Sequence, residues 1–306
     1  MSYSSHLSKI FINSLTVLDC AVWDLKLGPI GRSWNVDVEW TGSTNHEGVV
    51  LDFSAAKKLA KSVIDIHFDH RLFISEKQVR QEQDGRFTCF PSIETPFSDR
   101  FLMETYADSL VIFKHGIMRD VTEDSIQSLE ETLAIKILES SPENVTNVRI
   151  RLREHTQRDE SFYFNYLHSL RLHQGNCQRF HGHSNIIEVF ENGDFSTVKS
   201  AAAAEYLKGK YLVAESYVEL PPSESSARIE TAVKTAELDT DAFCWISYEG
   251  SQGPVQLRVP NAKLITMTDE SSIENISVWV HKHLFNDDPK ITVYAYEGLN
   301  KGAICP

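Results

Sequence analysis

An internal repeat constrains the fold of this chain more than any other feature of its 306 residues. Segments of the second half match segments of the first in the same order, which predicts two copies of one structural unit. The matched pairs are 162–168 with 10–16, 181–189 with 30–38, 194–199 with 52–57, 271–284 with 127–140, and 290–298 with 147–155. We therefore expect two tandem domains, spanning residues 1–155 and 156–306.

The first copy indicates which elements the unit contains. Residues 9–19 and 33–40 are rich in β-branched and aromatic side chains and predict a hairpin. The apolar spacing at 55–68 and 125–140 predicts two helices, and the alternating run at 147–154 predicts a last strand. These elements together indicate an α+β fold.

Two segments do not fit the repeat. The polar stretch HTQRDE at 155–160 is the predicted linker between the domains. Residues 75–123 have no counterpart in the second half, and their only clear element is a strand predicted within SLVIFKHGI at 109–117. The sequence does not indicate what this inserted segment does.

Composition excludes several classes of function. The formal net charge of −13 argues against a nucleic-acid partner, because phosphate backbones are bound by clustered Lys and Arg. The five cysteines are odd in number and contain no CxxC pair, so we expect free thiols and a reducing, cytoplasmic environment. No apolar run reaches membrane-spanning length and the N-terminus lacks a signal-peptide core, so we expect no membrane association.

Three histidines of the second copy are spaced to share one centre. His181 and His183 lie two apart in a predicted strand and so project to the same face. His168 ends the preceding predicted strand, and a hairpin would return it beside this pair. Three imidazoles leave one position of tetrahedral Zn²⁺ open, which is the catalytic pattern. Taken alone, an HxH pair is also compatible with a surface or hydrogen-bonded role.

The segment from His168 through Cys177 to HGHS at 181–184 resembles the zinc and nucleophile segment of the 6-pyruvoyltetrahydropterin synthase and 6-carboxytetrahydropterin synthase family. The resemblance implies the tunnelling fold (T-fold), an antiparallel sheet with its helices on one face. Such sheets join edge to edge into barrels, and exposed edges demand partners. We therefore expect a homo-oligomer. The resemblance also implies Zn²⁺ held by His168, His181 and His183.

Each copy lacks what the other keeps. In the first copy the repeat places Thr16, Ile30 and Arg32 at the zinc positions, so we expect no metal there. The family carries an Asp-His pair after its first helix, which matches Asp69 and His70. The tripeptide DFS occurs in both copies, at 52–54 and 194–196. Counting the same number of residues from it in the second copy reaches Tyr211 and Leu212, so we expect no such pair there.

The resemblance therefore implies a composite active site. Cys177 would be its proton carrier or nucleophile, His70 the base and Asp69 the group that orients His70. The sequence leaves open whether this site forms within one chain or between chains.

The resemblance also implies substrate contacts. Glu297 matches the family glutamate that holds the pterin ring, as does Glu154 of the first copy, and we choose Glu297 because it belongs to the histidine-bearing half. Ser272 and Glu274 resemble a threonine-x-glutamate helix start, although a capping-box-like N-terminus explains them equally well. Arg179, beside Cys177, is the candidate contact for a triphosphate.

These implications together describe a zinc-dependent lyase acting on 7,8-dihydroneopterin triphosphate. The arginine two residues after Cys177 and the serine after HGH look most like the 6-carboxytetrahydropterin synthases of queuosine biosynthesis. The alternative is a 6-pyruvoyltetrahydropterin synthase, which eliminates triphosphate. A non-catalytic pterin-binding or scaffold relative is the alternative of a different class. Product and oligomer size stay open at this point.

Overall fold

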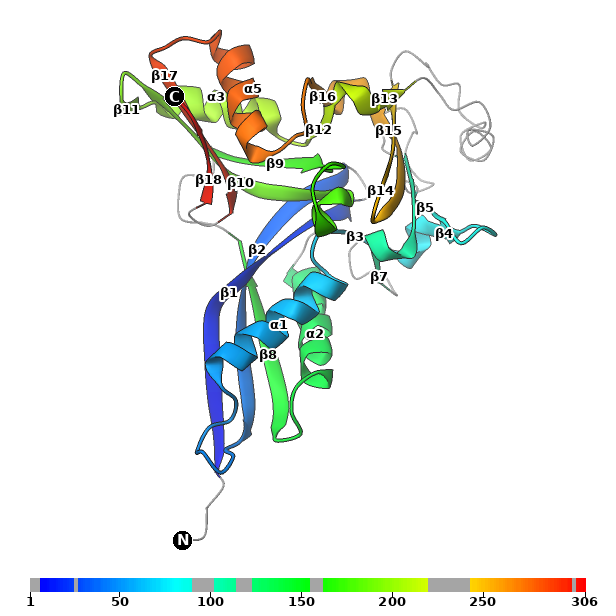
Figure 1. Ribbon diagram of the computed structural model, residues 1–306, viewed down its shortest axis with the longest axis vertical. Helices are drawn as coiled ribbons and strands as arrows, with labels where there is room; N and C mark the ends of the chain where they lie inside the picture. Colours follow the sequence, from blue (N-terminus) through cyan, green and yellow to red (C-terminus); the bar gives the residue numbers. More distant parts are fainter. Residues whose placement is uncertain are drawn as a thin grey trace.

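The computed structural model describes residues 6–24, 27–89, 102–113, 123–154, 162–219, 243–298 and 301–306. It is a mixed α+β protein with three sheets, two of them covered by a pair of helices (Figure 1). The predicted linker at 155–160 lies outside the described residues. No helix in the described part of the chain combines the length and apolar character needed to cross a membrane.

The first sheet is built from the hairpin that the sequence predicts. Its strand order is β7-β3-β1-β2-β8, with β1 and β2 antiparallel and β3 parallel to β1. The strands are β1 (Leu7–Asp24), β2 (Gly28–Ser43), β3 (Arg71–Ser75), β7 (Leu110–Phe113) and β8 (Val145–Arg153). The strand expected within 109–117 is therefore present as β7, and residues 114–117 lie outside the described residues.

Two helices cover one face of this sheet, α1 (Phe53–His67) and α2 (Glu123–Glu139). Asp52 caps α1, because its carboxylate accepts hydrogen bonds from the Ser54 and Ala55 amides. Burial of the apolar sides of both helices against the strands forms one core, which includes Trp34 and Trp40. This burial is the main force that holds the helices to the sheet.

The second sheet repeats the arrangement of the first. Its order is β16-β12-β9-β10-β17-β18, and the short β11 also pairs with β10. The strands are β9 (Tyr163–His168), β10 (His181–Glu191), β11 (Asp194–Phe195), β12 (Lys210–Ala214), β16 (Leu264–Met267), β17 (Ile291–Gly298) and β18 (Lys301–Cys305). Helices α3 (Thr197–Leu207) and α5 (Ile273–Phe285) cover it over a separate core.

A third sheet is formed jointly by both halves of the chain. Its order is β13-β14-β15-β6-β5-β4. Its strands are β4 (Val79–Gln81), β5 (Phe87–Cys89), β6 (Leu102–Thr105), β13 (Val218–Glu219), β14 (Phe243–Gly250) and β15 (Gly253–Pro260). The expectation that 75–123 has no counterpart is wrong, because β4, β5, β6 and β7 follow β3 in the same order in which β13, β14, β15 and β16 follow β12. The three strands of each half join through β6 and β15. Strands β4, β5, β6 and β13 have only two to four residues each, which is too few for a periodic pattern to be recognised in the sequence.

The two long hairpins meet in the middle of the molecule (Figure 1). They touch at Gly31 and Gly182: a Cβ on Gly31 would lie 2.2 Å from the Tyr166 carbonyl oxygen, and one on Gly182 would lie 2.5 Å from the Gly31 Cα. The Ser184 amide donates to Ser33 Oγ at 3.0 Å across the same contact. The two glycines shared by the repeat are therefore explained by close backbone approach.

Strand pairing corrects the repeat alignment in the first strand of each half. His181 pairs with His168, and Ile30, which matches His181, pairs with Val22. In the first half, therefore, Val22 and not Thr16 occupies the position that matches His168. Apolar alternation has a period of two, so it cannot distinguish registers that differ by an even number of residues. The expectation that this half lacks the three imidazoles is unaffected.

The alignment of Tyr211 and Leu212 with Asp69 and His70 is also wrong. His70 donates its amide to the Asp19 carbonyl at 2.7 Å, and Gly209 donates its amide to the matching Asn165 carbonyl at 2.8 Å. Lys208 and Gly209 are therefore the counterparts of Asp69 and His70. Counting from DFS fails because α1 has 15 residues and α3 has 11.

Candidate functional site

Three imidazoles converge on one point where β9 and β10 pair. His168 and His181 lie directly opposite each other, and His183 projects from the same face two residues further on. His168 Nε2 lies 3.0 Å from His181 Nε2 and 3.0 Å from His183 Nε2. All three side chains are buried. The structure thus brings together the three histidines that the sequence nominates.

The other ring nitrogen of each histidine faces an oxygen. His168 Nδ1 donates to the Ser271 carbonyl at 2.8 Å and His181 Nδ1 to the Arg179 carbonyl at 2.8 Å. Carbonyl oxygens only accept, so these Nδ1 atoms carry the proton and the Nε2 atoms present lone pairs. His183 Nδ1 lies 3.1 Å from Asp19 Oδ1. Partners of this kind orient metal-ligating histidines.

This donor set fits a divalent metal. Burial is the largest effect that holds the pKa values of His168 and His181 well below the ordinary range, so both rings are neutral. Neutral imidazoles with facing lone pairs repel one another unless a cation lies between them. Nitrogen ligands of tetrahedral zinc stand about 3.4 Å apart, close to the separation seen here.

Asp19 is a site residue that the sequence does not reveal. It comes from β1 of the first half, is 5% exposed, and accepts a hydrogen bond from Ser33 Oγ at 2.5 Å. Burial raises its pKa, but attraction to His183 and the hydrogen bonds outweigh burial, so the pKa is lowered. Its counterpart in the repeat is Asn165, and the difference in charge between these two residues is a sequence signal that distinguishes Asp19.

Cys177, His70 and Asp69 form a connected row within one chain. Cys177 Sγ lies 3.4 Å from His70 Nε2, and His70 Nδ1 lies 2.5 Å from Asp69 Oδ2. Asp69 Oδ1 also accepts the Asp19 amide at 3.0 Å, which fixes the carboxylate. Burial lowers the pKa of His70, yet the hydrogen bonds to Asp69 and Cys177 outweigh burial and hold that pKa well above the usual value.

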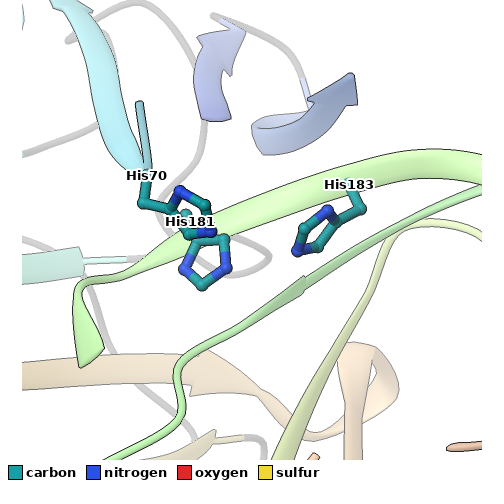
Figure 2. A group of neighbouring side chains, drawn as sticks. All are labelled: His70, His181 and His183. Atoms are coloured by element: carbon teal, nitrogen blue, oxygen red, sulfur yellow. The ribbon is translucent and has the colours of Figure 1, made fainter. Parts of the chain in front are cut away.

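This row lies against the histidine cluster. The rings of His70 and His181 have centroids 4.3 Å apart. Figure 2 shows His70 approaching His181 from a different element, with His183 further along the same strand. The ligand atoms of these three side chains lie within 4.8 Å of one another, so the row of Cys177, His70 and Asp69 and the histidine cluster belong to one site.

Glu297 and Glu154 occupy matching ends of β17 and β8. Glu297 is paired with Lys301 at 3.6 Å and its side chain is 32% exposed, whereas Glu154 is paired with Arg32 at 3.1 Å. Glu297 lies close enough to Tyr166 to contribute, after burial, to the raised pKa of that phenol. Tyr166 in turn stacks on His183, so this phenol lies between Glu297 and the histidine cluster in the chain of interactions.

Ser272 and Glu274 lie at the start of α5. Ser272 caps the helix by accepting the Asn275 amide at 3.4 Å, and Glu274 is exposed in the first turn. The expectation of a capping-box-like N-terminus is confirmed for Ser272, while the residue three after the cap is Asn275 and not an acid. The neighbouring Ser271 is the residue at this helix start that contacts the histidines.

A buried imidazole trio beside a cysteine-histidine-aspartate row defines a class of site suited to metal-assisted proton transfer. A sequence model of the 6-pyruvoyl tetrahydropterin synthase family matches residues 31–158, which include Asp69 and His70. Together with the curated relatives described next, this match shows that the chain belongs to the 6-pyruvoyl- and 6-carboxytetrahydropterin synthase family. The histidine trio and Cys177 lie outside the matched residues.

Two curated relatives are each named putative 6-carboxy-5,6,7,8-tetrahydropterin synthase. The protein of Pyrococcus abyssi is 29% identical over 124 residues, and that of Pyrococcus horikoshii is 26% identical over 124 residues. Each alignment covers 40% of this chain and 67% of the relative. Solved 6-pyruvoyltetrahydropterin synthases of Plasmodium vivax and Plasmodium falciparum give TM-scores of 0.36 and 0.32 at 18% and 17% identity, covering 50% of this chain and 94% of theirs.

Proposed function

We propose that this protein is a zinc-dependent lyase acting on 7,8-dihydroneopterin triphosphate, with two tandem tunnelling-fold domains at 1–155 and 156–306. One observation carries the proposal: Cys177 Sγ lies 3.4 Å from His70 Nε2, and the His70 ring lies 4.3 Å from the ring of His181, a member of the imidazole trio. Metal ligands and a proton carrier are thus adjacent in one chain. All five cysteines are free thiols, which supports our placement of the protein in the cytoplasm.

The residues present suggest how the reaction proceeds. His168, His181 and His183 would hold Zn²⁺, which when bound supplies Lewis-acid polarisation of the substrate side-chain oxygens. Cys177 would take a proton from a side-chain carbon and exchange it with His70, whose ring Asp69 keeps in the required tautomer. Glu297 is our candidate for the pterin ring, because a carboxylate accepts two parallel hydrogen bonds from its guanidine-like edge.

The names of the relatives favour a 6-carboxytetrahydropterin product, as in queuosine biosynthesis. A 6-pyruvoyltetrahydropterin product is the second candidate, because that family's model matches the chain. Incubation of the metal-loaded protein with 7,8-dihydroneopterin triphosphate and identification of the product by mass spectrometry tests the proposal. Unchanged substrate with full metal occupancy would overturn it in favour of a non-catalytic, pterin-binding relative.

We expect Asp19→Asn to weaken zinc binding by about 10- to 100-fold, because Asp19 is the outer partner of His183. The substitution keeps the size of the side chain but removes its charge. Competition with a chromogenic chelator measures the zinc affinity directly. Asp37→Asn is a suitable control, since Asp37 pairs with Arg153 and has no contact with the histidines among its described hydrogen bonds and ion pairs. An Asp19→Asn protein with wild-type affinity would contradict this role.

We expect the protein to be a closed homo-oligomer in solution. Strand β8 is the last strand of the first sheet and has one described neighbour, β2, so its outer edge is available to another chain. Closed symmetry satisfies such edges in all copies. Light scattering coupled to size-exclusion chromatography measures the mass. A monomer of 34.8 kDa would exclude the proposed barrel assembly.

A further inference from the structure

The segment that carries Cys177 is held to the third sheet by the side chain of Gln178. Gln178 directly follows Cys177 at the end of the 3-10 turn Gly175–Gln178 and is 9% exposed. Its Oε1 accepts hydrogen bonds from Ser251 Oγ at 2.9 Å and from the Gln252 amide at 3.3 Å. Both donors belong to the turn between β14 and β15. The residue beside the proton carrier thus reaches the sheet that both halves form.

The other end of the Gln178 amide is equally fixed. Its Nε2 donates to the His173 carbonyl at 2.5 Å, within the connection between β9 and β10. A carbonyl oxygen only accepts and a backbone N–H only donates, so the two ends of the amide cannot exchange places. A glutamate at this position would set a carboxylate oxygen against the His173 carbonyl. The site therefore fits glutamine and disfavours its nearest isostere.

The turn between β14 and β15 is shaped around Gln178. Tyr248 donates its hydroxyl to the Gln178 carbonyl at 2.9 Å. Burial is the largest effect that holds the pKa of this phenol well above its ordinary value, so it keeps the proton that it donates. A Cβ on Gly250 would lie 2.7 Å from Gln178 Oε1. Glycine is therefore required there by the close approach of the amide to the backbone of the turn.

Cys177 lies between two neighbours that are both held. On one side, Asn176 Nδ2 donates to the Asp65 carbonyl of α1 at 2.8 Å. On the other side, Gln178 is bonded to the third sheet. The first half thus holds one neighbour of the cysteine and the third sheet holds the other. This arrangement defines where the thiol lies relative to His70, whose Nε2 is 3.4 Å away.

We propose that Gln178 is a positioning residue, anchored by the turn between β14 and β15, that holds Cys177 within reach of His70. The role rests on the proposed function, in which Cys177 exchanges a proton with His70. Such an exchange needs the two groups near hydrogen-bond distance, and a displacement of about 1 Å can cost about 100-fold in rate. The third sheet then acts on the site through Gln178.

Alkylation of Cys177 by iodoacetamide at neutral pH tests this role without requiring turnover. Peptide mass spectrometry separates Cys177 from the other partly exposed thiols, Cys244 and Cys305. A protonated imidazole beside a thiol favours the reactive thiolate, so His70→Ala should slow alkylation about tenfold. Gln178→Glu and Gly250→Ala should each slow it to the same level, because they release Cys177 from His70.

A double-mutant cycle distinguishes positioning from a general structural effect. Gln178→Glu added to His70→Ala should cause no further fall in the alkylation rate, because both changes remove one contact. Gln174→Glu is the matched control, since it makes the same chemical change at an exposed residue whose side chain forms no capping hydrogen bond. It should react like the wild type.

Melting temperature and zinc content show whether each full-length, zinc-loaded variant is folded. Should Gln178→Glu fail to fold, Gly250→Ala completes the same cycle and leaves the sequence of the Cys177 segment unchanged. A wild-type alkylation rate in the folded variant overturns the positioning role. A fall that is equally large in the His70→Ala background also overturns it, because the effect would then not pass through His70.

Turnover separates this role from the proposed function. In an active enzyme, Gln178→Glu should lower kcat about tenfold or more and leave KM within about twofold, because a displaced proton carrier slows chemistry and not binding. A raised KM with unchanged kcat would overturn the positioning role. Coupled alkylation rates in a protein without turnover support the positioning of Cys177 and count against the proposed function alone.

Discussion

His181→Ala is expected to abolish stable zinc binding. Only two imidazoles remain in this variant, and two neutral ligands do not complete a three-histidine zinc site. Metal content measured by elemental analysis should fall from about one ion per chain to less than about a tenth of that value. The expected single ion reflects one histidine trio in two halves, since Val22, Ile30 and Arg32 occupy the matching positions of the first half.

The His181→Ala variant can be paired with a control that preserves the fold. His173→Ala changes an exposed histidine in the connection between β9 and β10. Its Nδ1 lies 3.0 Å from the Gln174 carbonyl oxygen, and its ring contacts no other histidine among the described residues. It should retain full metal occupancy and the wild-type melting temperature. Two ions per chain in the wild-type protein, or none after expression with ample zinc, would show that the histidine trio has been wrongly interpreted.

The parts of the site that the sequence revealed are those held together by local spacing. His168, His181 and His183 lie within one hairpin, where the two-residue period of a strand places them on one face. Asp69 and His70 were recognisable because they are consecutive and follow a helix. Glu297 and Glu154 were matched correctly, because β17 and β8 pair with β10 and β2 in the same register.

The parts that the sequence did not reveal depend on contacts between the halves. Asp19 reaches His183 only because the hairpins pack together at Gly31 and Gly182, and no spacing within either half encodes that contact. The third sheet was missed because its two halves pair only through β6 and β15, about 150 residues apart in the sequence, and because β4, β5, β6 and β13 have only two to four residues each, too few to show a period.

Cys177→Ala and His70→Ala should each lower kcat by at least about 100-fold and leave zinc bound. Neither residue belongs to the imidazole trio, so metal content separates this effect from loss of the metal. A His70→Gln variant adds a second test, because it retains a hydrogen-bonding side chain but cannot carry the proton. Wild-type turnover in either His70 variant would rule out the composite site.

Co-expression of the Cys177→Ala chain with the His70→Ala chain distinguishes a site within one chain from a site between chains. The structure places His70 Nε2 3.4 Å from Cys177 Sγ of the same chain. In a hetero-oligomer of Cys177→Ala and His70→Ala chains, every such site then lacks one of the two groups. We therefore expect no recovery of activity in co-expressed oligomers whose mixed composition is verified by native mass spectrometry. Recovery would require an intact Cys177 to meet an intact His70 of a neighbouring chain, and would move the catalytic row from the contact between the two halves to the interface between subunits.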